Sequence, residues 1–301
     1  MIALARRFQF VDDSYRSELP AISCDGLVPG AALDLTHWQG NHTPSQYKAD
    51  TSTEIALNFA FAPEASELWA EAVVVNNHFD TDGILSVWVL LEPERAAECR
   101  ELLVAAAEAG DFDEWPALDR GLWLDASIRA IGSMAADDEA AYKTALPQLP
   151  ELVRHVDERR DLWGKECDDL QKSVEALQSG RLQAQRLDAI GIMIHAIGQP
   201  EVPGPLLARR FLPNTRRYLL AFERERGKFD YRYERPRYAW ADTVVRPVLP
   251  PPDAAALACL LGPEWTDAGL PGMTGIVRTR VPVKEPPDAL ILRLDQVDSL
   301  G

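Results

Sequence analysis

Apolar runs alternate with amphipathic stretches in the first half of the chain. Runs rich in apolar residues at 31–35 and 71–77 predict short strands, the second covered on both faces because it is β-branched and uninterrupted. Helical patterns cover 50–61, 84–91 and 93–110. Strands that alternate with helices predict an α/β fold, with a mainly parallel sheet flanked by helices.

Two of these predicted helices carry end signals. Asp50 or Thr51 is a candidate N-cap for the first, and Glu54 completes a capping box with Thr51. Gly110 is expected to end the helix at 93–110, because glycine readily adopts the left-handed conformation that follows many helices.

The pattern changes from about residue 126. It predicts a long charged helix over 149–179, a more buried helix over 182–198, and a hairpin over 216–238 that turns at Arg226 and Gly227. One more helix and two closing strands follow, at 254–262, 275–283 and 289–294. We therefore expect an α/β domain at 1–125, a helical connector at 126–212 and a smaller α+β carboxy-terminal domain at 213–301.

Composition limits the class of protein. The chain has 301 residues, 47% of them apolar and 26% charged, and none of its apolar runs approaches the roughly 18 residues of a membrane span. Arginines stand where a signal peptide would be apolar, so we expect a cytoplasmic protein that does not enter membranes. The four cysteines form no C-x-x-C pair, which argues against a disulfide framework or a thiolate zinc site.

Charge is distributed unevenly along the chain. The formal net charge is −16, and the whole acidic excess lies in residues 1–150. Such a field repels long nucleic acids and attracts cations. A small anionic substrate remains compatible with it if a metal ion offsets the charge.

The stretch "HFDTDG" directly follows the predicted strand at 71–77. It places His78, Asp80 and Asp82 on one side of an extended chain, next to Gly83. An imidazole and two carboxylates suit Mn²⁺ or Mg²⁺, and open α/β sheets carry their chemistry just past the carboxyl ends of strands. The alternative is an ordinary acidic turn that caps the next helix, and the spacing alone leaves both open.

A second polar cluster follows the strand at 31–35. Asp34, His37 and Asn41 stand in a polar turn that could instead be a capped loop with Asx-turns. Asp111, in the acidic loop "GDFDEWP", is a further candidate ligand.

Together these stretches resemble the DHH phosphoesterase superfamily. "HFDTDGILS" matches its H-x-D-x-D-G motif, and "LDLTHWQGNHTPSQYKADTSTEIA" is similar to a loosened D-H-H motif, in the reverse order along the chain. The resemblance implies two Mn²⁺ ions, ligand roles for Asp34 and His37, and a smaller carboxy-terminal domain that supplies basic groups. The chain also looks like an uncharacterised bacterial family with the stretches "THW-x-GN-x-TP" and "NHFDTDG".

The predicted function is a metal-dependent hydrolase of a phosphoester or phosphoanhydride in a small molecule or short nucleotide. It would use one or two Mn²⁺ or Mg²⁺ ions, although an amide or another bond stays open as the target. The expected metal ligands are Asp34, His37, His78, Asp80, Asp82 and Asp111. His37 and Asp82 are also the catalytic candidates, His37 either as a ligand or as the acid for the leaving group.

Substrate binding is predicted for Asn41, Arg209, Arg217, Arg278 and Arg280, because arginine pairs can present two forks to a phosphate. A solvated strand face is the alternative for these arginines. The rival function is a non-catalytic interaction protein on a DHH-like scaffold, with the charged helix at 149–179 as its working surface.

Overall fold

The computed structural model describes residues 6–12, 14–16, 19–187, 190–195, 210–212, 215–268 and 275–298. The chain forms two compact units. The first unit contains Met1–Cys167 and Ala241–Pro247, and the second contains Asp168–Trp240 and Val248–Gly301. Within the described ranges, none of the helices has both the length and the apolar character needed to cross a membrane.

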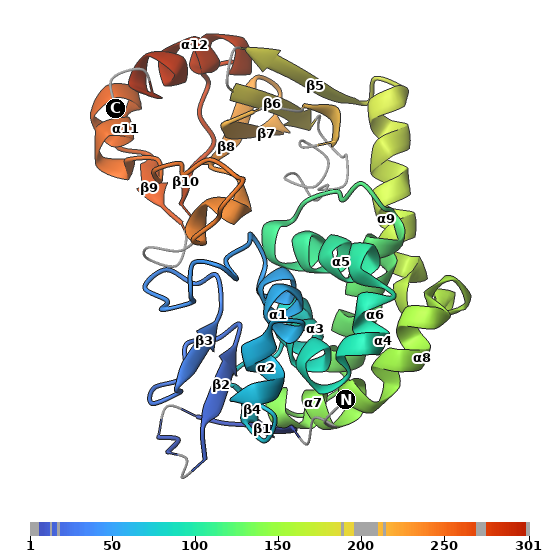
Figure 1. Ribbon diagram of the computed structural model, residues 1–301. Coiled ribbons are helices and arrows are strands. Elements are labelled where there is room, and N and C mark those ends of the chain that lie inside the picture. The colour runs from blue at the N-terminus through green and yellow to red at the C-terminus, as the bar shows by residue number, and fades with distance from the viewer. Residues whose placement is uncertain are drawn as a thin grey trace. The chain divides into compact units, whose positions relative to one another are not determined.

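Four parallel strands form the sheet of the first unit (Figure 1). Their order across the sheet is β1 (Arg7–Phe10), β4 (Val73–Asn76), β2 (Ala21–Cys24) and β3 (Leu33–Leu35). Because all four run the same way, the loops that follow β2, β3 and β4 leave the sheet at a single edge. The functional candidates lie in these loops.

Helices gather beside this sheet. They are α1 (Ser52–Ala60), α2 (Pro63–Glu67), α3 (Thr81–Leu91), α4 (Pro93–Ala97), α5 (Arg100–Phe112), α6 (Arg120–Ser133), α7 (Asp138–Ala145), α8 (Leu149–Arg154) and α9 (Arg160–Gln178), with 3₁₀ turns η1 (Leu146–Gln148) and η2 (Val156–Glu158). Helix α9 runs from the first unit into the second. The predicted fold class, a parallel sheet flanked by helices with a helical middle and a separate carboxy-terminal region, is confirmed.

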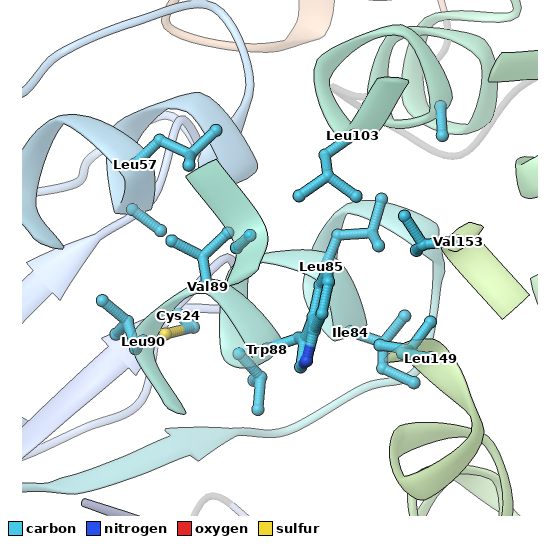
Figure 2. Close-up of a cluster of buried hydrophobic side chains, with 14 of the residues drawn as sticks. Cys24, Leu57, Ile84, Leu85, Trp88, Val89, Leu90, Leu103, Leu149 and Val153 are labelled. Atoms are coloured by element: carbon cyan, nitrogen blue, oxygen red, sulfur yellow. The ribbon is translucent and has the colours of Figure 1, made fainter. Parts of the chain in front are cut away.

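Helix α3 lies at the centre of the first unit's main core. Its residues are buried from Thr81 to Leu90, and Figure 2 shows Trp88 and Val89 among side chains from β2, α1, α5 and α8. Strand β4 contributes Val74 to this core, while Val73 and Val75 belong to a smaller core. Burial on both faces explains why β4 reads as an uninterrupted apolar run.

The predicted helix at 93–110 is divided and longer than expected. It forms α4 and α5, and α5 continues through Gly110 to Phe112 before Asp113 adopts a left-handed conformation with φ 48°. A Cβ at Gly110 would lie 2.9 Å from Asp125 Oδ1 and 3.0 Å from Thr81 Cβ. Gly110 therefore allows close packing between helices instead of ending one.

The predicted continuous helix over 149–179 was also wrong. The chain forms α8, the turn η2 and then α9, because His155 and Arg159 leave the helical region. Val156 is fully buried here, and its carbonyl accepts a hydrogen bond of 2.8 Å from Trp163 Nε1. Packing in the core thus overrides the helical pattern at this bend.

A six-stranded sheet forms the second unit. Its order is β5 (Leu182–Leu187), β6 (Ile190–His195), β7 (Arg217–Glu225), β8 (Lys228–Glu234), β10 (Ile276–Thr279) and β9 (Trp265–Asp267), and only the β6–β7 pair is parallel. The helices α11 (Ala254–Leu261) and α12 (Pro287–Asp298) contribute to its core, and η3 (Arg237–Trp240) follows β8. The predicted hairpin is confirmed, with Gly227 at φ 71° in its turn.

Two predictions in this unit were wrong. In the described part of the expected helix at 182–198, residues 182–187 and 190–195 form strands β5 and β6, in which the β-branched Ile190, Ile192 and Ile194 favour extended structure. The expected strand at 289–294 lies in α12, where Leu290, Ile291 and Leu294 share one buried face. Short apolar runs do not by themselves distinguish a strand from a buried helix.

Candidate metal centre

Acidic and histidine side chains converge at the carboxyl edge of the first sheet. Asp25 directly follows β2, His37 follows β3, and His78 and Asp80 follow β4, while Asp82 lies in the first turn of α3. Asp111 joins them from the last turn of α5. Parallel strands that end side by side bring together residues that the sequence separates.

The first donor group is buried. It contains Asp25, His37, Asp82 and Asp111, each with a possible ligand atom within 4.8 Å of the others. His37 Nε2 lies 3.1 Å from Asp111 Oδ2 and 3.6 Å from Asp25 Oδ1. His37 Nδ1 lies 3.8 Å from Asp82 Oδ2.

The second donor group opens to solvent. It contains Asp25, His78 and Asp80, and His78 Nε2 lies 2.9 Å from Asp25 Oδ2 and 3.2 Å from Asp80 Oδ2. The side chains of His78 and Asp80 are 24% and 40% exposed. Because Asp25 belongs to both groups and offers each a different oxygen, the two groups adjoin.

A backbone carbonyl fixes the orientation of His37. Its Nδ1 lies 2.7 Å from the carbonyl oxygen of Asp50, which can only accept a hydrogen bond, so Nδ1 carries the proton. Nε2 therefore faces Asp111 and Asp25. Histidines that bind metals commonly donate their other ring nitrogen in this way, which fixes both the tautomer and the ring plane.

The two aspartates of "DTD", Asp80 and Asp82, accept hydrogen bonds from the amino termini of two different helices. Asp80 is the N-cap of α3 and accepts a 2.8 Å hydrogen bond from the backbone of Gly83. Asp82 instead accepts hydrogen bonds of 2.7 Å from the backbone N–H groups of Ser52 and Thr53, at the start of α1. The capping alternative thus holds for Asp80 on its own helix, whereas Asp82 binds the amino terminus of a different helix.

Asp25 is the member of the site that the sequence reading missed. It adopts a left-handed conformation with φ 61°, is fully buried, and accepts a 2.8 Å hydrogen bond from Ser52 Oγ. A non-glycine residue in this region is uncommon and often marks a functional position. The available signal was "AISCDG", in which a short apolar run ends at Asp-Gly, but the stretch contains no histidine and no second carboxylate.

The backbone around the centre is packed too closely for extra atoms. A Cβ at Gly26 would lie 2.7 Å from Asn76 Oδ1, and one at Gly83 would lie 2.6 Å from Asn76 Nδ2. The buried Asn76 accepts from Gly26 N and donates to the hydroxyl of Tyr142. This amide thus links the loop after β2 to α7.

The centre concentrates negative charge away from water, and the pKa values reflect this. Burial opposes a charged imidazole, yet the hydrogen bond to Asp111 and the charges of Asp82, Asp111 and Asp25 raise the pKa of His37 to about 10. The carboxylates around His78 likewise outweigh its burial and raise its pKa to about 11. Burial and the charge of Asp25 raise the pKa of Asp82 to about 7. Without a cation, protons therefore neutralise this cluster.

The donor set fits a hard or borderline divalent ion. Carboxylate oxygens suit Mg²⁺ and Mn²⁺, imidazole nitrogen is accepted by Mn²⁺ and other transition ions, and neither group contains a thiolate. A divalent ion would replace the protons that offset the buried carboxylates. The described residues therefore include a possible metal-binding group of the predicted kind, without specifying the ion.

The other predicted residues lie elsewhere. Asp34 is in neither donor group, and its carboxylate accepts a 3.2 Å hydrogen bond from His42 N. Asn41 Nδ2 donates to the carbonyl of Trp38 at 2.8 Å and to Asp242 at 3.1 Å.

The predicted arginines belong to the second unit. Arg209 lies outside the described residues, and Arg217 is buried and donates to the carbonyls of Arg216 and Pro250. Arg278 and Arg280 line a hollow of about 530 Å³ on the second sheet. Its other lining residues include Arg224 and Arg232.

The family of the protein follows from comparison with known sequences. A family model described as "Family of unknown function (DUF6687)" matches residues 6–266, so the chain belongs to this family. None of the curated proteins matches the chain. Among solved structures, it is similar to the pGpG-specific phosphodiesterase PggH from Vibrio cholerae, with 11% identity and a TM-score of 0.41 over 93% of this chain and 84% of that chain. The function is therefore inferred from the site.

Proposed function

We propose that the protein is a divalent-metal-dependent hydrolase that cleaves a phosphoester or phosphoanhydride in a small molecule or short nucleotide. The observation that carries this proposal is the pair of adjoining donor groups that share Asp25. Sites of this composition hold one or two ions, and Mn²⁺ or Mg²⁺ suits the ligands. A bound ion would supply positive charge and lower the pKa of a water molecule that it holds.

The residues of the two groups have different tasks in this proposal. In the buried group, His37 and Asp82 would hold an ion away from solvent. His78 and Asp80 are the donors that a substrate can reach, because they are partly exposed. The full burial of His37 favours its role as a ligand over the role of an acid that meets the leaving group.

Four arginines line the hollow on the second sheet, namely Arg224, Arg232, Arg278 and Arg280. Arg232 and Arg278 lie directly opposite each other on neighbouring strands. Acidic side chains already offset part of this positive charge, because Arg232 Nε lies 2.6 Å from Glu234 Oε2 and Arg224 Nε lies 2.7 Å from Asp230 Oδ2. We keep Arg278 and Arg280 as candidates for binding an anion in this hollow, whereas the guanidinium of Arg217 is already engaged by carbonyl oxygens.

The test is hydrolysis by the full chain after its metal has been removed and then restored. Bis-p-nitrophenyl phosphate, inorganic pyrophosphate and a short dinucleotide would be assayed with Mn²⁺, with Mg²⁺ and with chelator. We expect turnover of at least one substrate with metal and none with chelator. Failure to bind either ion would overturn the proposal, and binding without hydrolysis of any of them would favour a non-catalytic protein.

A further inference from the structure

A short segment from late in the sequence lies against the metal centre. Residues Ala241–Pro247 belong to the first unit, although the chain on both sides of them belongs to the second. We call this segment the strap. The backbone N–H of its Asp242 donates a 2.7 Å hydrogen bond to the carbonyl of His37.

The strap holds Asp50 through several hydrogen bonds. The backbone N–H groups of Val244, Val245 and Arg246 all donate to the Asp50 carboxylate, and Arg246 Nη1 lies 2.6 Å from Asp50 Oδ2. Asp50 is the residue whose carbonyl accepts the Nδ1 proton of His37. The strap therefore anchors the group that orients the imidazole.

Arg246 also holds the other side of the centre. Its guanidinium makes a two-point contact with Glu114, at 3.1 and 2.7 Å, and lies 2.7 Å from Glu108 Oε1. Both carboxylates flank the last turn of α5, which carries Asp111, the carboxylate that faces His37 Nε2.

The ring of Phe112 contacts both Arg246 and His37. Arg246 lies over the ring of Phe112, 4.8 Å from its centroid, and this ring is 5.6 Å from that of His37. Arg246 is 12% exposed, and the carboxylates of Asp50 and Glu114 are 5% and 6% exposed. Water screens ion pairs of this kind only weakly, and a planar arginine fork fits them in a way that lysine cannot reproduce.

We infer that Arg246 is a positioning residue for the metal centre, acting through Asp50 and the end of α5 to hold His37 between its carboxylates. This inference rests on the metal-binding part of the proposed function and not on the hydrolysis. Neither Arg246 nor Asp50 belongs to a donor group. Groups that orient metal ligands commonly contribute about 10- to 100-fold to metal affinity.

The test compares Mn²⁺ binding by wild type, Arg246→Lys and Arg246→Met in calorimetry at fixed pH. We expect affinity to fall about 10- to 100-fold in Arg246→Met and less in Arg246→Lys, which keeps the charge but loses the fork. Electron spin resonance would also show a weaker histidine nitrogen coupling to the bound Mn²⁺ in Arg246→Met. Glu108→Gln, at a side chain that is 25% exposed, serves as a milder variant if Arg246→Met does not fold.

The matched control is Arg6→Lys. Arg6 is a buried arginine of the first unit that donates to the carbonyls of Trp69, Leu90 and Ala65, away from the centre. It should lose stability without losing Mn²⁺ affinity.

The possible outcomes distinguish the positioning role of Arg246 from the proposed hydrolase function. Equal affinity in wild type and the strap variants, or equal losses in Arg6→Lys, would overturn the positioning role while the metal site stands. Weakened binding in the strap variants alone, in a protein that hydrolyses nothing, would support the positioning role and remove the hydrolase. A wild-type chain that binds no Mn²⁺ would overturn both.

Discussion

Asp80 combines two tasks that one substitution can separate. It caps α3 through Gly83 N and faces His78 in the open donor group. Asparagine caps a helix about as well as aspartate but lacks the charge that a hard cation needs. Asp80→Asn should therefore keep the cap of α3 while its Mn²⁺ affinity in calorimetry falls about 10-fold or more.

A capping residue away from the centre provides the comparison for Asp80. Asp253 caps α11 by accepting from Ala255 N and Ala256 N, so Asp253→Asn should change neither property. Equal Mn²⁺ affinity in Asp80→Asn and wild type would remove Asp80 from the site. Asp82→Asn is less informative, because both Asp82 oxygens accept backbone hydrogen bonds and an amide can replace only one.

Metal binding should depend steeply on pH. Without metal, the pKa values of His37 and His78 are about 10 and 11, so both rings are charged at neutral pH. A metal ion needs neutral imidazoles and must displace these protons, so a rise in pH favours binding. Filling both groups should release the two imidazole protons and, below pH 7, part of the proton of Asp82 as well, so the combined affinity should rise by at least ~100-fold per pH unit between pH 6 and 8.

Calorimetry in buffers of different ionisation enthalpy measures this proton release directly. Binding without proton release, or binding that weakens as pH rises, would show that the two histidines do not hold metal.

At the scale of elements, the start of α3 packs closely against Asn76 and Tyr142. A Cβ at Gly83 would lie 2.6 Å from Asn76 Nδ2 and 3.0 Å from the hydroxyl of Tyr142. Alanine favours a helix over glycine, but overpacking of a tight site costs roughly 1–3 kcal/mol. We expect Gly83→Ala to lower the free energy of unfolding by about that amount in denaturant titration.

Gly164 in α9 is the matched glycine. A Cβ there would meet Cγ of the flexible Arg160 side chain, which can move. Gly164→Ala should therefore stabilise the protein by roughly 0.5–1 kcal/mol. If both alanine variants were more stable than wild type, the close approach of α3 to Asn76 would not be a constraint.

The sequence predicted elements where burial and period agree, and failed where tertiary packing decides. The strand at 73–76 and the helix at 81–91 have uninterrupted apolar patterns and were found. In 182–195 and 287–298 the apolar residues suit either structure, and the sheet partners or the covered face decide. Propensity could not anticipate the bend at 155–159, where Val156 is buried and its carbonyl accepts a hydrogen bond from Trp163 Nε1.

The sequence predicted most of the donor residues of the candidate centre but not all of them. His37, His78, Asp80, Asp82 and Asp111 were proposed from motifs that directly follow strands or a helix, and the structure places them in the two groups. Asp25 follows a four-residue strand without a motif, and Asp34 turns toward His42 instead.

The contribution of Arg246 could not be read from the sequence. It reaches Asp50 across 196 positions. No periodicity or local motif connects residues so far apart.

At the scale of the molecule, the division into two units predicts where metal will stabilise the chain. A ligand that binds only the folded state stabilises it by about 2.7 kcal/mol at 100 times its dissociation constant. All donor residues lie in the first unit, so Mn²⁺ should slow hydrogen exchange there. The strap at 241–247 should gain protection with it, since its N–H groups donate to His37 and Asp50.

Hydrogen exchange with mass spectrometry, with and without Mn²⁺, measures this pattern peptide by peptide. Protection should appear in the loops after β2, β3 and β4 and in the strap, while β7 and β8 on either side of Gly227 remain unchanged. Because the strap lies between two stretches of the second unit in the sequence, its protection distinguishes coupling through folded contacts from a general effect of the ion. Protection of β7 and β8 without protection of the strap would place the metal in the second unit and contradict the candidate centre.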